Sequence, residues 1–189
     1  VPNTTKFIKS LLIVISSIKN STLIVVDAAK DLALDPSLYP NYYTDNFNVI
    51  LDKLTEYFTK LIEQKQTKEG IILIYGLNKF ITKLNDNTKL NEFIKKVKEY
   101  EKMGIVIVDD ASKIKQYAFE TWFNGTFSIN DGIFIGRGVS DQNLLHLSTV
   151  TREMSKDIKN DMAYLISEGY ATLFKTIDFI SEEGDSFEK

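Results

Sequence analysis

Short apolar runs alternate with amphipathic stretches through the first half of the chain. Three runs are almost free of charge and short enough for strands buried on both faces: Thr22–Asp27, Ile71–Tyr75 and Ile105–Asp109. Apolar residues three or four positions apart predict helices over Lys6–Ile18, Asp45–Gln66, Leu77–Leu84 and Leu90–Lys102. The stretch Asp31–Thr44 holds two prolines and is predicted as a loop. Strands that alternate with helices indicate an α/β fold, with a mostly parallel sheet and helices on both faces.

The pattern changes after residue 110. Asp110–Phe123 fits either helix or irregular structure, and Ile133–Ile135 is predicted as a short strand. Two segments joined at Glu168–Gly169 predict a hairpin, which we expect to form an antiparallel edge of the sheet, over Asp161–Ser167 and Tyr170–Phe179. Because no linker or repeat divides the sequence, we predict one domain over residues 1–180 and an acidic flexible tail over residues 181–189.

Composition narrows the classes of function. The 189 residues carry a formal net charge of −3 and a pI of about 5.3, which argues against a general nucleic-acid-binding surface. The absence of cysteine excludes disulfides and thiolate zinc sites, and the single histidine excludes a site with several histidine ligands within the chain. No apolar run reaches the roughly 18 residues of a membrane-spanning helix. Arginine is scarce, with only Arg137 and Arg152 present.

Parallel α/β sheets bind ligands beyond the carboxyl ends of their strands, where this sequence places Asp27, Tyr75 and Asp109. The pair Asp109-Asp110 invites comparison with the acids of receiver domains, which bind magnesium and accept phosphate. Such a site also needs an acidic pair on the first strand, and Asp27 is followed there by two alanines. We therefore favour solvated loop acids at Asp109 and Asp110.

Two further positions hold residue types that often act in sites. His146 lies within an apolar stretch, which predicts a packed structural histidine rather than a ligand or a base. Trp122 and Phe123 have the side chains of a partner contact, yet core packing is favoured because a large aromatic residue is usually buried.

The start of the first predicted helix lacks the residues of a phosphate-binding loop. That loop needs glycines whose N–H groups cradle phosphate, a lysine that neutralises its charge and a hydroxyl group that binds magnesium. Here the chain reads Val1-Pro2-Asn3-Thr4-Thr5-Lys6, without glycine and with a proline that removes one donor. Taken alone, these residues favour a plain capped helix. Lys6 does not rescue the site. It stands two positions after the place that the phosphate-binding lysine would occupy, so its side chain points about 200° further round the helix.

The second half of the chain resembles a known family. The run Asp131–Asn143, which reads DGIFIGRGVSDQN, is similar to the closing segment of the FtsK/SpoIIIE-type domains at the C-terminus of EssC, the membrane coupling protein of type VIIb secretion systems. Trp122-Phe123 upstream and Ala163–Tyr170 downstream fit the same family. The resemblance implies a three-layer, P-loop NTPase-like fold of the FtsK/RecA type and spans most of the chain. The first half matches mainly by pattern.

The resemblance also assigns positions in a degenerate nucleotide site. Thr4 takes the position of the phosphate-binding lysine, and Thr5 that of the hydroxyl group that binds magnesium. Asp27 matches the acid that ends the next strand, and Tyr75 stands where the magnesium-binding aspartate is expected. Arg137 is the candidate for an arginine that acts in trans on a neighbouring subunit. Because Thr4 has no charge and Tyr75 has no carboxylate, hydrolysis by this domain is not expected.

The function implied is therefore that of a pseudo-ATPase module in substrate recognition, assembly or regulation of the export motor. The alternative is an ATP-binding or hydrolysing motor domain with an altered site. No cofactor is expected, although weak binding of Mg-ATP fits the alternative. The implied partners are WXG100-type substrates or their export signals and neighbouring ATPase domains of the same chain, but no nucleic acid. The expected location is the cytoplasmic face of the bacterial membrane, with tethering only through the parent protein, and upstream strands of the domain are expected to precede Val1.

Overall fold

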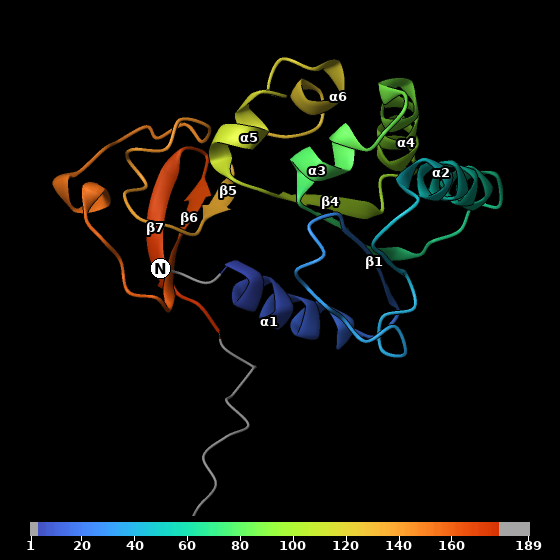
Figure 1. Cartoon of the computed structure of the whole chain (residues 1–189), viewed down its shortest axis with the longest axis horizontal. Coiled ribbons are helices and arrows are strands. Elements are labelled where there is room, and N and C mark those ends of the chain that lie inside the picture. Colours follow the sequence, from blue (N-terminus) through green and yellow to red (C-terminus); the bar gives the residue numbers. More distant parts are fainter. Residues whose placement is uncertain (1–3, 178–189) are drawn as a thin grey trace, which may run out of the picture.

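The computed structural model describes residues 4–177, and the tail predicted over residues 181–189 lies outside them. Its centre is a four-stranded parallel sheet in the order β2-β1-β3-β4. Figure 1 labels β1 and the edge strand β4 of this sheet. The strands are β1 Ser21–Asp27, β2 Tyr42–Tyr43, β3 Glu69–Tyr75 and β4 Met103–Val108. The three long strands are the three apolar runs of the sequence, and their ends are in register, since Asp27 pairs with Tyr75 and Tyr75 with Val108.

Helices cover both faces of this sheet, as the alternation of strands and helices predicts. Side chains of a strand point alternately to opposite faces, and Val25 and Leu73 pack with α1 Thr4–Ser16 on one face. Ile24 and Ile72 point to the other face, which α2 Phe47–Glu63, α3 Leu77–Thr82 and α4 Asn87–Tyr100 cover. Two short helices, α5 Ala111–Lys115 and α6 Thr121–Asn124, contribute to the same larger core.

The predicted hairpin forms, but it does not extend the parallel sheet. The strands β6 Met162–Ser167 and β7 Tyr170–Lys175 join β5 Gly132–Phe134 in a separate antiparallel sheet, in the order β5-β6-β7. This sheet has its own small core around Val139, Tyr164 and Ile166. It lies beside the parallel sheet in Figure 1, and the rings of Phe7 in α1 and Phe174 in β7 approach to 6.5 Å between centroids.

Two smaller elements differ from the expectations. The predicted loop Asp31–Thr44 contains β2, which pairs in parallel with β1 through Val25–Tyr42 and Val26–Tyr43. A short 3-10 helix, η1, occupies Arg152–Ser155 in a region with no predicted element. None of the helices within residues 4–177 is both long enough and apolar enough to cross a membrane.

Candidate functional site

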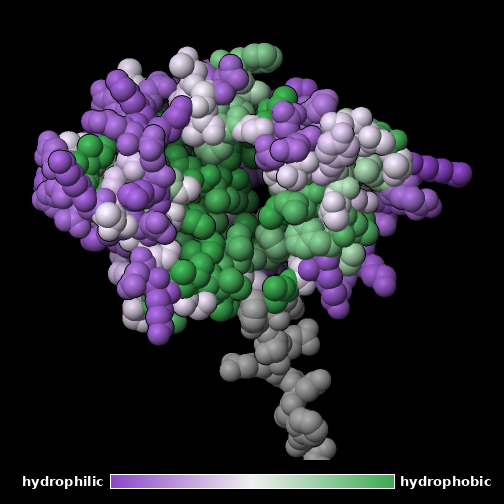
Figure 2. Space-filling model, turned by 180° about the vertical axis from the view of Figure 1, so that it is seen from behind, coloured by the Kyte–Doolittle hydropathy of each residue, from purple (hydrophilic) through white to green (hydrophobic). Residues whose placement is uncertain are grey.

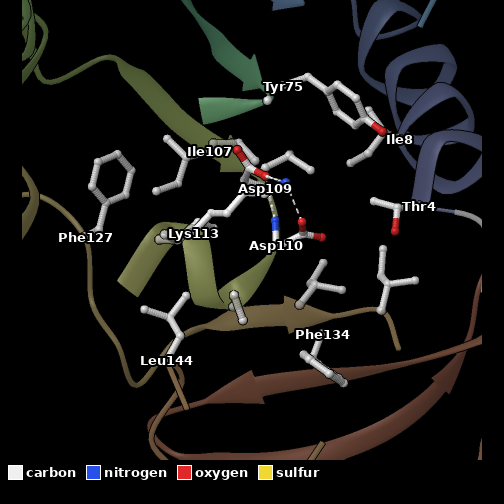
Figure 3. A pocket seen from close by; sticks show the side chains of 18 of the residues that line it. Thr4, Ile8, Tyr75, Ile107, Asp109, Asp110, Lys113, Phe127, Phe134 and Leu144 are labelled. Carbon is white, nitrogen blue, oxygen red and sulfur yellow. Dashed lines mark hydrogen bonds and ion pairs between the residues drawn. The ribbon is translucent and has the colours of Figure 1, made fainter. Parts of the chain in front are cut away.

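The carboxyl ends of β1, β3 and β4 lie at one edge of the sheet, as the parallel register requires, and the first turn of α1 reaches the end of β3 through Thr5. Beside them lies a cleft of about 860 Å³, which separates β4 and α1 from β5 (Figure 3). Thr4 and Ile8 of α1, Tyr75 and Asp109 all line this cleft. The carboxyl ends of the strands, where the sequence predicted a site, therefore border a cavity.

Thr5 and Tyr75 are bonded directly to each other. Their hydroxyl groups lie 2.9 Å apart, which ties the first turn of α1 to the end of β3. Only 8% of Tyr75 is exposed. Burial raises the pKa of this tyrosine, and the carboxylates of Asp31, Asp27 and Asp109 add to the rise, whereas the Thr5 bond lowers it. The two hydroxyl groups thus satisfy each other.

Asp27 is completely buried, and its carboxylate is fully engaged by the protein. One oxygen, Oδ1, accepts from the backbone N–H groups of Lys30 at 2.8 Å and Asp31 at 3.3 Å. The other, Oδ2, accepts from the Leu32 N–H and from the Tyr42 hydroxyl group, both at 2.9 Å. These bonds hold the turn after β1 and connect it to β2, so Asp27 has a structural role here.

Asp109 is also held by the fold and is not the solvated loop acid that we expected. Its side chain is 9% exposed, and its Oδ2 accepts the Asn78 N–H at 2.8 Å in the first turn of α3. Asp110 is 69% exposed, in agreement with the expectation, and its carboxylate lies 2.6 Å from Lys113 Nζ. Because Asp110 and Asp109 both face it, the pKa of Lys113 is raised.

The charges around the cleft oppose a bound phosphate. The residues that line it include four carboxylates and two ammonium groups. The carboxylates are those of Asp31, Asp109, Asp110 and Asp131, and the ammonium groups are those of Lys79 and Lys113. The carboxylates of Asp109 and Asp110 already accompany Lys113, so little positive charge is left for an anion. Residues 4–177 contain no cluster of three or more histidine and acidic side chains that could hold a metal ion.

The other sequence-predicted positions lie in different places. Arg137 is exposed near the antiparallel sheet, with its guanidinium group 3.3 Å from Asp157. His146 is exposed, so the prediction of a packed structural histidine was wrong. Apolar neighbours in sequence do not bury it, because the segment has no regular helix or strand and His146 faces outward from it. Trp122 and Phe123 are 5% and 4% exposed within the main core, which confirms the packing role.

Sequence reasoning missed three groups that shape the site. Tyr42 bonds Asp27, Asn78 bonds Asp109, and Lys113 pairs with two acids. The spacing of Asp109 and Lys113, four residues apart at a helix start, signals an ion pair on one helix face. Tyr42 and Asn78 gave no comparable signal, since their partners lie 15 and 31 residues away.

No protein-family model matches the chain, and no curated protein matches it in sequence. The fold itself shows an α/β protein with a four-stranded parallel sheet and a separate three-stranded antiparallel sheet.

Proposed function

We propose that the chain is a degenerate FtsK/SpoIIIE-type ATPase module that binds other proteins and does not hydrolyse nucleotide, as the C-terminal domain of an EssC-type secretion motor. The observation that carries the proposal is the bond between Thr5 and Tyr75. Each would stand at a magnesium-binding position of a working site. Joined to each other and flanked by acids, they offer neither a carboxylate nor a positive charge to a magnesium-bound phosphate.

The geometry around this bond supports the same conclusion. Phosphoryl transfer depends on positive groups that stabilise the charge of the transferred phosphate. Thr4, in the position of the phosphate-binding lysine, presents only a hydroxyl group to the cleft. Asp27, the acid in the next strand, is surrounded by its own hydrogen-bond donors and leaves no oxygen facing the cavity.

An exposed apolar strip supports the binding role. Ile13 and Val14 near the end of α1 and Ile18 in the turn that follows the helix are 40%, 38% and 55% exposed. Exposed apolar residues that lie close together in the chain are candidates for a protein contact. In the proposed motor the partner at this strip is a neighbouring ATPase domain of the same chain, and WXG100-type substrates or their export signals are the other partners.

Calorimetric titration with Mg-ATP tests the loss of nucleotide binding. We expect no saturable heat up to millimolar nucleotide. Saturable binding in the micromolar range would overturn the proposal, and the domain would then be an ATPase with an altered site. Magnesium-free ATP and Mg-AMP serve as controls, because a genuine nucleotide site would prefer the complete magnesium complex.

The binding role has its own measurement. Titration of the neighbouring ATPase domain into this chain should give saturable heat, and Ile13→Lys should weaken binding at least about tenfold, which is 1.4 kcal/mol. Val49→Lys makes the same kind of change at an exposed apolar position of α2, outside the strip, and should leave the affinity within about twofold. Equal binding by both variants would exclude the strip as the contact.

A further inference from the structure

The sheet of parallel strands has one long open edge. β4 pairs only with β3, and bonds of a parallel pair use alternate residues of each strand. Gly70 and Gly76 of the β3 side donate to the carbonyls of Lys102 and Val108, so even-numbered residues of β4 face β3. The N–H and C=O groups of Ile105 and Ile107 therefore point into the cleft, and no strand within residues 4–177 pairs with them.

This edge strand has the composition of a central strand. Ile105 and Ile107 belong to the core on one face of the sheet and Val106 and Val108 to the core on the other, and all four are only half-buried. Strands that are apolar on both faces normally lie inside parallel sheets, and natural edge strands are short, charged or covered. The apolar composition of β4 therefore predicts a neighbouring strand on both sides, and its exposed edge has none within residues 4–177.

The opposite wall of the cleft is a second open edge. β5 is the terminal strand of the antiparallel sheet and pairs only with β6. Its residues Ile133 and Phe134 line the same cavity as β4, as Figure 3 shows for Phe134. Seen from behind, the molecule is hollowed by an apolar band between its two parts (Figure 2). A single strand seated there would meet an open edge on its β4 side and an apolar wall from β5.

The handedness of the fold identifies the strand that belongs in this position. The chain passes from β1 to β3 and on to β4 in one direction across the sheet, and its connecting helices α2 and α4 cover one face. The helix before β1, α1, covers the opposite face. Crossovers between parallel strands are right-handed in nearly all proteins. A parallel strand that leads into α1 must therefore lie on the β4 side of β1. There the strands within residues 4–177 leave one position unoccupied, at the open edge of β4.

We propose that the cleft receives one further strand, an extended apolar segment that precedes α1 in the chain and runs parallel to β4. The first turn of α1 supports this occupant, because Thr4 and Ile8 line the cleft at the carboxyl end of β4, where a parallel strand would finish. The strand would cover Ile105 and Ile107 and bring the two sheets together. This inference does not depend on the proposed function.

Amide hydrogen exchange, followed by NMR, tests the proposal on two chains. One is the 189-residue chain, and the other adds whatever coding sequence precedes Val1, up to roughly 25 residues, which is enough for a strand and its connections. In the extended chain we expect the Ile105 and Ile107 amides to exchange at least about 100-fold more slowly. The amides of Val106 and Val108 face β3 and should be protected in both chains.

Three results would overturn the proposal. The first is equal exchange of Ile105 and Ile107 in both chains. The second is protection of these amides in the 189-residue chain that grows with protein concentration, because a second copy would then occupy the edge. The third is a preceding sequence without an apolar segment of strand length.

A pair of proline variants checks the direction of the new hydrogen bonds. Ile107→Pro removes an N–H that points away from β3, a position where edge strands tolerate proline. We expect this variant to keep the 189-residue fold but to abolish the added protection of Ile105 in the extended chain. Val106→Pro removes an N–H used by β3 and should unfold both chains. If Ile107→Pro does not fold, the exchange comparison of the unsubstituted chains still decides the question.

Discussion

Substitution of Asp27 by asparagine should destabilise the protein strongly, although it changes a single atom. The carboxylate accepts four hydrogen bonds in a fully buried position, from Lys30, Asp31, Leu32 and Tyr42. In Asp27→Asn an amide NH₂ group must replace one oxygen. The least costly arrangement places it at Oδ2, where the Tyr42 hydroxyl group can turn to accept, and this leaves the Leu32 N–H without a partner.

The magnitude follows from these bonds. A buried donor without a partner costs about 1–3 kcal/mol, and each remaining bond weakens when its acceptor loses its charge. Together these losses lower the free energy of unfolding by about 3 kcal/mol. For a domain of this size the melting temperature should fall by roughly 6–12 °C.

Urea denaturation followed by circular dichroism measures this loss. Asp31→Asn is the matched control, because the Asp31 side chain is exposed and only its backbone N–H contacts Asp27. The control should lie within about 0.5 kcal/mol of the unsubstituted protein. If Asp27→Asn were as stable as the control, the carboxylate would not hold the turn after β1, and its structural role would be refuted.

Three further predictions concern the same region. Gly76→Ala should lower the free energy of unfolding by about 2–3 kcal/mol, because Gly76 has a φ of 78° and an added Cβ would lie 2.9 Å from Ala29. Gly104→Ala is the control: its added Cβ meets nothing nearer than 4.0 Å, so the loss in the same denaturation assay should be under about 1 kcal/mol. Burial and the Asp27 carboxylate raise the pKa of Tyr42 from 10.0 to about 12, so the stability from its neutral form is complete below pH 10 and is lost as the pH rises to about 12. Tyr42→Phe should therefore lose less stability than the unsubstituted protein between about pH 10 and pH 12 in the same denaturation assay. Arg137→Ala should change stability by less than about 0.5 kcal/mol, since its partner Asp157 is exposed, and a larger change in thermal denaturation would contradict a surface role.

The sequence was a good guide to the parallel sheet. Each apolar run is a strand, and the shared direction of parallel strands brings Asp27 and Tyr75 to one edge, as predicted. Periodicity tells which face a residue occupies but not which strand will be its neighbour. For this reason the hairpin of β6 and β7 was predicted correctly as a hairpin and assigned wrongly to the edge of the parallel sheet.

The chemistry at the strand ends was harder to predict. A carboxylate at the end of a buried strand suits both catalysis and structure, and the sequence does not show which donors reach it. Asp27 is satisfied partly by Tyr42, from a segment predicted as loop, and Asp109 by the N–H of Asn78. The Thr5–Tyr75 bond joins residues 70 positions apart and depends on the packing of α1 against β3. Such contacts are decided by tertiary structure.

The two edge strands of the parallel sheet, β2 and β4, differ in length, and this difference limits self-association through the sheet. β2 has only two residues, so it offers almost no backbone for another strand, while β4 offers six. Two copies that paired through β4 would be related by a two-fold axis. This contact would use the long open edge of the parallel sheet in each copy. Even if no strand filled the cleft and copies paired through β4, the assembly would end at a closed dimer, because the short β2 at the other edge of the sheet blocks fibre growth.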